Sequence, residues 1–527
     1  MPRIAKTALL LAMVLAVTTA GTLASNILTL SSVQEVGTVD PARATDYTET
    51  ISVINIYDPL VFPDGNGVVQ PKLAETWDVS EDALTYSFSL RQDAVFHDGT
   101  QVFAEDVAFS MERMLALKDG YSWMWADLIS GIDIIDDYTI SFTLREPFAP
   151  FLATLPAFCV LNKDLVVAHT QPGDYGDYGD YGVEWLNTAV DTDAGSGPYT
   201  LRSWDRGREI VFARFDDYFL GWPQGDKSVD EAHMFNLPAT ATLKTMLRSG
   251  ELVMTDNLRT FEDYEDMSAY NGVTVIPADT GQQITFKINT KAAPTDDIHI
   301  RRMLAWAFDY AMAITEISPG SLQSRGPVPS AIPGQNPDLF QYTQDLDKAR
   351  EELELSSYYP NVPTLHIVMG IGAEAWRRMA LSLQAALATI GVNLEIHMET
   401  WGRMCELAAQ PETTPNLMAI IQAPMYSDPD TFLYSMYHSD AAGTWMSTEW
   451  LQNDTVDELI TESRRTVDPA ARQELLNTVQ EIIVDECPDI FIYQARLYYA
   501  MQNYVRGFTY RPVMSYEFYF HDLWFER

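Results

Sequence analysis

Short stretches of alternating apolar and polar residues recur along this chain, and amphipathic helical patterns lie between them. Strict alternation predicts half-buried strands, here at 26–32, 84–91, 139–145, 273–277, 283–290, 364–369 and 392–398. Apolar residues spaced by three and four predict helices, here at 104–117, 300–313, 376–391 and 468–488. Strands and helices are interleaved along the chain, which indicates a mixed α/β fold.

Two of these helices carry clear end signals. Asp468 is placed to cap the last helix, Pro469 suits its first turn, and Pro488 stops it. Gly391 is a C-cap signal for the helix at 376–391. The 527 residues exceed what one hydrophobic core usually serves, so we expect two or three domains.

The first 24 residues have the order of a secretory signal peptide. Arg3 and Lys6 precede an apolar stretch, and small residues end it near Ala24. No later stretch approaches the roughly 20 apolar residues that a membrane span needs. No cysteine lies near the cleavage point, so a lipid anchor is not expected there. We therefore expect a soluble, exported, periplasmic protein.

The chain is strongly acidic. Its formal net charge is −40, and removal of Arg3 and Lys6 with the signal peptide takes this to −42. Such a charge repels nucleic acid and anionic lipid surfaces, so neither is expected as a partner. Cys159, Cys405 and Cys487 are widely spaced and odd in number, which does not indicate a disulfide framework. One disulfide or three free thiols remain open.

A search for catalytic and metal-binding motifs is mostly empty. GxSxG, SxxK, HExxH, CxxC, GxGxxG and Walker-type loops are all missing. The eight histidines are scattered, without the i, i+4 spacing of helical metal ligands. The repeat GDYGDYGDYG at 173–182 spaces its aspartates by three, whereas calcium loops use two. We predict an extended loop there and expect no metal or cofactor.

The stretch APMYSDPDTF at 423–432 leaves three interpretations open. Asp428 and Asp430 flank Pro429, with Met425 and Tyr426 just upstream. Two carboxylates this close could be an acid/base pair, a calcium site, or part of the lining of a ligand cleft.

Several blocks of the sequence resemble the extracytoplasmic solute-binding proteins of family 5, the peptide, opine and nickel receptors of ABC importers. The long block at 57–115, which contains PKLAETWDVSEDALTYSFSLRQDAVFHDG, resembles the signature of that family. Further similar blocks follow in family order at 195–204, 214–252, 287–314, 326–334 and 342–353. The resemblance covers nearly all of residues 27–520.

The resemblance implies a type II periplasmic-binding-protein fold. Such a fold has two α/β lobes around a ligand cleft, joined by two hinge strands, with an extra domain inserted in the first lobe. Lobe I is expected at 26–68, 196–283 and 485–527, the extra domain at 69–195, and lobe II at 284–484. Lobes of this kind close on their ligand by a hinge motion.

The implied function is that of a receptor and not of an enzyme. It would capture a peptide or peptide-like solute, including an opine, a modified amino acid or an oligosaccharide, and deliver it to an inner-membrane ABC permease. A monomer without cofactor is expected. The alternatives are a chemosensory or chaperone-like binding protein and a secreted hydrolase.

The resemblance also suggests where the ligand binds. In dipeptide and oligopeptide receptors of the family, the segment matching 422–429 runs from a Trp to an Asp and then to an Asp-Pro pair. The first Asp of that segment pairs with the peptide α-amino group. Alignment on Asp428-Pro429 puts Met425 at that Asp and Gln422 at the Trp, and leaves Asp428 and Asp430 with scaffold roles.

A second loop also departs from the family pattern. Dipeptide receptors of the family often place an Arg for the ligand carboxylate in the loop that matches 368–376, and this chain has no basic residue there before the helix.

The candidate ligand contacts come from three segments of the chain. For each candidate a packing or turn role is the competing interpretation. The candidates are Arg43, Thr45, Asp46 and Tyr47 in the first loop, Trp401 at an aromatic position of the cleft, and Gln422, Met425 and Tyr426.

Overall fold

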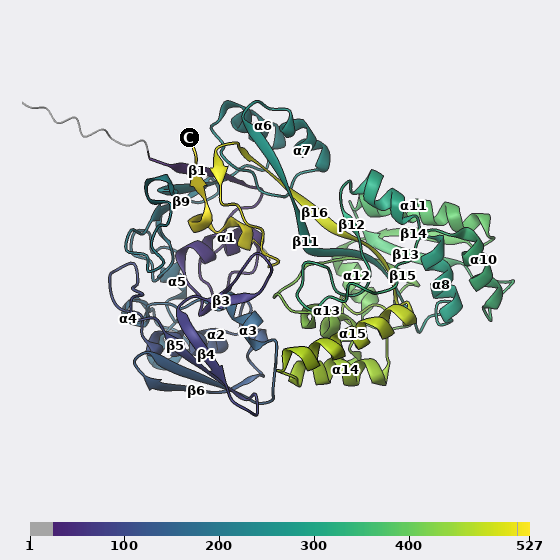
Figure 1. Cartoon of the computed structure of the whole chain (residues 1–527), viewed down its shortest axis with the longest axis horizontal. Helices are drawn as coiled ribbons and strands as arrows, with labels where there is room; N and C mark the ends of the chain where they lie inside the picture. Colours follow the sequence, from purple (N-terminus) through teal and green to yellow (C-terminus); the bar gives the residue numbers. More distant parts are fainter. Residues whose placement is uncertain (1–24, 514) are drawn as a thin grey trace, which may run out of the picture.

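The computed structural model describes residues 25–513 and 515–527. The predicted signal peptide at 1–24 lies outside these described residues. The elements form two groups, and the long strands β11 (Val273–Ile288) and β16 (Asp489–Gln502) run between them (Figure 1). Among the described residues, no helix combines the length and the apolar character needed to cross a membrane.

The first group contains two four-stranded sheets. One has the order β1 (Ile27–Ser32), β10 (Glu231–Asn236), β9 (Glu209–Arg214) and β8 (Tyr199–Asp205). The other has the order β4 (Ala74–Val79), β5 (Thr85–Leu90), β7 (Thr139–Leu144) and β6 (Ile129–Asp136).

Each of these two sheets has its own apolar core. Helix α1 (Tyr47–Ile56) contributes Ile51 and Ile56 to the core that contains Leu28 and Phe212. Helix α2 (Ala104–Leu117) packs Val107 and Met111 against Phe88 and Phe142 of the second sheet. The range of α2 agrees with the one predicted from its apolar spacing. Val107, Met111 and Met114 are all buried in this core.

Shorter elements complete the first group. They are β2 (Val61–Pro63), β3 (Val69–Pro71), β17 (Val505–Arg506), β18 (Trp524–Phe525), α3 (Phe151–Thr154), α4 (Lys163–Ala168), α5 (Val183–Leu186), α6 (Thr240–Ser249) and α7 (Phe261–Ser268). Strands β2 and β3 form an antiparallel pair just before the second sheet.

The second group is built on one six-stranded sheet. Its order is β12 (Leu322–Gln323), β16, β11, β15 (Leu417–Gln422), β13 (Leu365–Gly370) and β14 (Leu394–Glu399). One face is covered by α8 (Ile298–Ala307), α10 (Leu346–Leu355) and α11 (Glu374–Thr389). Met404 of α12 (Trp401–Ala408) packs on the other face. Helices α13 (Asp430–Tyr437), α14 (Asp454–Arg465) and α15 (Pro469–Glu486) share a further core.

Strand β11 corrects one sequence prediction. The stretches 273–277 and 283–290, predicted as separate strands, belong to one strand that pairs with β16 along most of its length. A register shift between Asp279 and Gln283 absorbs the irregular residues between them. The predicted lobe boundary at 283/284 falls inside this strand, and the domain limits themselves stay predictions.

The helix predicted at 300–313 is also corrected. Helix α8 ends at Ala307, and Phe308 is extended with φ −75° and ψ 136°. Asp309 then accepts a hydrogen bond from the Met312 amide and starts the short helix α9 (Tyr310–Met312). An aspartate inside an apolar helical pattern acted as an N-cap, which is the role it favours.

The caps predicted for α15 are confirmed. The Asp468 side chain accepts a hydrogen bond from the Ala471 amide, and Pro469 is the first helical residue. Cys487 ends the helix in the left-handed conformation, just before Pro488. Cys159, Cys405 and Cys487 are all free thiols, which settles the open question of a disulfide.

Candidate ligand-binding cleft

An apolar cavity of about 100 Å³ lies where segments of both element groups meet. Its wall comes from α1 and the loop before it, from the chain around α3, from the loop after β15 and from the C-terminal segment. The lining residues are Pro41, Ala44, Thr50, Val53, Ile54, Tyr121, Pro156, Ala157, Cys159, Ala423, Pro424, Met425, Val513 and Tyr516.

None of the described residues that line this cavity carries a charged side chain. Met425 is half-buried on the wall and also packs against the core of the second four-stranded sheet. A thioether is only a weak hydrogen-bond acceptor. The cavity therefore favours an apolar or uncharged group of a ligand.

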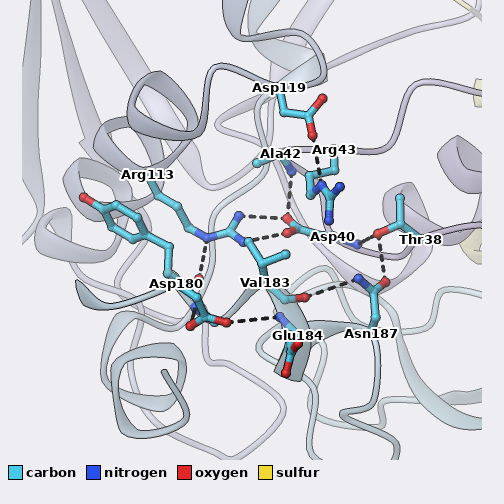
Figure 2. Close-up of polar contacts among 12 residues, drawn as sticks. Thr38, Asp40, Ala42, Arg43, Arg113, Asp119, Asp180, Val183, Glu184 and Asn187 are labelled. Carbon is cyan, nitrogen blue, oxygen red and sulfur yellow. Dashed lines mark hydrogen bonds and ion pairs between the residues drawn. The ribbon is translucent and has the colours of Figure 1, made fainter. Parts of the chain in front are cut away.

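The loop before α1 is held in place by a buried ion pair (Figure 2). Arg113 of α2 donates two hydrogen bonds to Asp40, at 2.8 and 2.6 Å, and a third to the Tyr181 carbonyl. Both side chains of the pair are 0% exposed. Asp40 also accepts from the Ala42 amide and, through its carbonyl, from Arg43 and Ala44. The loop therefore reaches the cavity as a rigid turn.

The four candidates in this loop have different surroundings. Arg43 is exposed and pairs with Asp119 at 2.9 Å (Figure 2), and Thr45 is exposed as well. Asp46 caps α1: one oxygen accepts from the Thr48 and Glu49 amides, and Glu49 reaches back to the Asp46 amide. These bonds give Asp46 a structural role.

Tyr47 is half-buried, and its hydroxyl has no hydrogen-bond partner among the described residues. Its ring meets Phe518 edge-on at 5.7 Å. Burial, with the nearby Glu517 and Asp256 carboxylates, raises the pKa of Tyr47 well above its ordinary value. The phenol is therefore neutral at physiological pH and available as a donor.

The loop after β15 is held by a second pair of carboxylate contacts. Arg472 of α15 donates to both oxygens of Asp428 at 2.7 Å. Asp430 accepts from the Tyr426 hydroxyl at 2.8 Å and lies 3.3 Å from Arg464. Both aspartates are buried, and burial raises the pKa of Asp430. These contacts favour the scaffold roles predicted for Asp428 and Asp430.

Gln422 and Tyr426 are both buried, so little of either side chain is open to solvent. Gln422 is 3% exposed, pairs with Gln283 across β11, and neither end of its amide has a partner among the described residues. Tyr426 is 8% exposed and belongs to the core of the second four-stranded sheet. Gln422 thus has free hydrogen-bonding capacity, while the Tyr426 hydroxyl is used by Asp430.

Trp401 does not line the cavity. It is the first residue of α12, is 53% exposed, and meets Trp445 edge-on at 5.1 Å. Its N-terminal neighbour Thr400 caps the helix through the Arg403 amide. Of the eight candidates, Met425 is the one that lines the cavity, and the other contacts to ligand stay predictions.

Sequence reasoning missed two aromatic residues of the cavity wall. Tyr121 follows α2 and donates to the Thr45 carbonyl at 3.3 Å, and Tyr516 donates to the Pro156 carbonyl at 2.7 Å. Burial, with the Glu49 and Asp46 charges nearby, raises the pKa of Tyr121 to about 12. Neither residue belongs to a periodic pattern or motif, so no signal in the sequence marks it.

Two histidines that looked scattered in the sequence also meet. His366 of β13 and His397 of β14 lie beside Glu395, and among the described residues this is the one group of metal-ligand type.

The repeat at 173–182 forms the predicted loop. Its Asp180 side chain accepts hydrogen bonds from the Gln171 and Gly182 amides and orders the turn.

Two α/β groups joined by long strands, with a cavity lined from both, define a two-lobed solute-binding protein of the type II periplasmic-binding fold. The family described as bacterial extracellular solute-binding proteins, family 5, matches residues 68–444, and the chain belongs to it. These are non-enzymatic proteins, which excludes the hydrolase alternative. The chain is a substrate-binding protein of the ABC-importer type, in a peptide-binding family.

Curated relatives and solved structures cover nearly the whole chain. The chain is 26% identical to the probable D,D-dipeptide-binding periplasmic protein DdpA of Escherichia coli, over 91% of this chain and 90% of the relative. It is 28% identical to di/tripeptide-binding protein 2 of Pseudomonas aeruginosa, over 91% of each. The periplasmic binding protein DppA of Helicobacter pylori, solved with the peptide STSA, matches with a TM-score of 0.72 at 25% identity, over 95% and 98% of the chains.

Proposed function

We propose that this protein captures a peptide-like solute that presents no free α-amine at Met425, and passes it to an ABC permease of the inner membrane. Candidate ligands are a blocked peptide, a neutral sugar-like solute, or an N-substituted amino acid such as an opine, whose secondary ammonium has an additional carboxylate within the ligand as counter-charge. The observation that carries the proposal is the uncharged cavity with Met425 on its wall.

Burial of an ammonium group beside Met425 would be costly. An unpaired charge removed from water costs several kcal/mol unless a carboxylate and hydrogen bonds compensate. The carboxylates of the two loops that border the cavity all have partners within the protein. Arg472 binds Asp428 through both oxygens, Arg464 and the Tyr426 hydroxyl contact Asp430, and Asp46 and Glu49 form the capping box of α1. None of the described residues that line the cavity is a carboxylate, so an α-amine at Met425 would lack a direct counter-charge there.

A thermal-shift panel tests the ligand class. It pairs free di- and tripeptides with their N-acetyl forms, beside opines and oligosaccharides. A ligand at a hundredfold excess over Kd stabilises its receptor by about 2.7 kcal/mol. We expect N-substituted ligands to raise the melting temperature more than their free counterparts. Stabilisation by free peptides alone, abolished by acetylation, would return the protein to ordinary peptide uptake.

A substitution at Met425 sharpens this test. Met425→Asp supplies the missing carboxylate, so we expect it to shift preference toward free peptides and away from N-acetyl peptides. Met425→Leu is the matched control, because it keeps an uncharged side chain of similar volume. Equal preference in the Asp and Leu variants would mean that this position does not face the ligand's amino end.

Closure of the lobes is a further part of the proposal. We place the hinge in β11 and β16, because these two long strands run between the element groups. The predicted limit between lobe I and lobe II at 283/284 falls in β11, and the one at 484/485 falls at the end of α15, just before β16. A ligand that contacts both lobes favours the closed state. Small-angle scattering should show a smaller radius of gyration with bound ligand; an unchanged radius with a ligand proven to bind would argue against closure.

Delivery to a permease is proposed from the family alone. Export through the signal peptide at 1–24 would place the receptor in the periplasm, where a permease recognises its closed form. Detergent co-purification of the ligand-loaded receptor with a permease tests this. Binding to a chemoreceptor or to unfolded chains, with no permease recovered, would support the chemosensory or chaperone-like alternative.

A further inference from the structure

The three side chains His366, Glu395 and His397 converge on one exposed spot of the six-stranded sheet. His366 Nδ1 lies 3.1 Å from His397 Nε2, and the nearest Glu395 oxygen lies 3.5 Å from the first nitrogen and 3.8 Å from the second. We propose that these three residues bind a divalent transition-metal ion, and that Zn²⁺ is the ion that suits them.

The backbone register explains why they meet. Strands β13 and β14 are parallel, and His366 is the direct partner of Glu395. His397 follows Glu395 by two residues, so it projects from the same face of the sheet. All three donors therefore lie on one side of two neighbouring strands, with β14 at the sheet edge.

The spacing of the three donor atoms fits a zinc ion. The two histidine nitrogens and the Glu395 oxygen form a triangle with sides of 3.1, 3.5 and 3.8 Å, and the point equidistant from its corners lies about 2.0 Å from each atom. Zn–N and Zn–O bonds are roughly 2.0–2.2 Å long. An ion could sit there without movement of the strands. Two imidazole nitrogens suit zinc, copper or nickel and disfavour magnesium and calcium, which prefer oxygen ligands.

Solvent can supply the remaining ligand. The side chains of His366, Glu395 and His397 are 45%, 60% and 42% exposed, so water reaches the open coordination position. The net negative charge of the protein also draws cations toward its surface. None of the three residues lines the apolar cavity, so the metal site is separate from the proposed solute site.

The experiment is a zinc titration of the mature chain by calorimetry, without a polyhistidine tag and with millimolar Mg²⁺ to saturate simple carboxylate sites. We expect one Zn²⁺ per chain. His366→Ala and His397→Ala should each weaken binding by about tenfold or more, because the loss of even an outer-shell partner costs 10–100-fold. Glu395→Gln should weaken it as well.

A matched control separates this site from general histidine binding. His299 also lies beside a carboxylate, at 2.7 Å from Glu352, but has no second histidine; His299→Ala should leave zinc affinity unchanged. Melting without metal should be the same in the His366, Glu395 and His397 variants as in the wild type, because these three side chains are 42–60% exposed. Equal zinc binding by the wild type and the His366→Ala/His397→Ala double variant, or no binding by either, would overturn the proposal.

The proposed metal site and the proposed solute site can be tested separately. The double histidine variant should still be stabilised by the solute that stabilises the wild type, since the two sites share no residue.

Discussion

The two loops that border the cavity are anchored by the same device in different settings. Each uses an aspartate bound through both oxygens by an arginine of a distant helix: Asp40 by Arg113, and Asp428 by Arg472. The first pair is 0% exposed on both sides, whereas Asp428 and Arg472 are 9% and 14% exposed. The first loop is thus embedded within one element group, and the second lies nearer to solvent.

The difference concerns what each loop can offer a ligand. The first loop ends in a helix cap, so its carboxylate at Asp46 is already in use. The second loop leaves Gln422 with an unpaired amide and Met425 on the cavity wall. The first loop therefore leaves the Tyr47 hydroxyl without a partner among the described residues, and the second places the uncharged Met425 on the cavity wall.

Breaking the buried pair should have the largest effect. Arg113→Met leaves Asp40 charged and unpaired inside the protein, which should lower the free energy of unfolding by about 3–5 kcal/mol. Urea denaturation measures this loss. Arg43→Met is the control: its ion pair with Asp119 is exposed, and exposed pairs contribute about 0–1 kcal/mol. Equal losses in the two variants would contradict a special anchoring role for Asp40.

A pH titration tests the buried polar region beneath the first loop. Glu517 accepts hydrogen bonds from Tyr499 and Asn257, and its burial raises its pKa to about 7 from an ordinary 4.5. Between these values the folded state binds more protons than the unfolded state, so stability falls as pH rises. The slope is at most about 1.4 kcal/mol per pH unit.

Glu517→Gln should remove this slope while it keeps a hydrogen-bond acceptor in place. The measurement is the difference in unfolding free energy between wild type and variant from pH 4.5 to 7.5, which cancels the other titrating groups. A difference that does not change with pH would show that Glu517 is already ionised throughout.

Breaking the second anchor should cost less. Arg472→Gln removes charged hydrogen bonds to Asp428, each of which is worth about 1.5–3 kcal/mol, but the residual exposure of the pair lets water compensate. We expect a loss of about 2 kcal/mol, together with weaker solute binding because the Met425 loop loses its support. Lost stability with unchanged solute affinity would separate the anchor from recognition.

Trp401 should give the smallest effect on stability. Its ring is 53% exposed, so Trp401→Ala should leave the unfolding midpoint nearly unchanged. If the ring stacks on a ligand, binding weakens by about 0.5–1.5 kcal/mol beyond the lost contact area. Phe340→Ala is the matched control, because Phe340 is 54% exposed and does not line the cavity. Normal binding by Trp401→Ala would assign the ring to packing against Trp445.

Local patterns predicted much of this molecule because their physical causes are local. The range of α2 follows from its apolar spacing, and the start of α15 follows from an N-cap aspartate and a proline at the first turn. The same local rules were incomplete at Asp309, where capping outweighed the helical pattern on either side. Family membership was also recognisable, because its motifs occur in order along the chain.

The sequence by itself determined the mixed α/β class and the receptor family, and the family resemblance singled out the loop that puts Met425 on the cavity wall. Tertiary structure decided which carboxylates are free, since Asp46 and Asp428 find their partners only after folding. It also brought Tyr121 and Tyr516 to one cavity, and His366 to His397 across two parallel strands. Contacts between residues far apart in the chain depend on strand register and packing, and no local pattern encodes either.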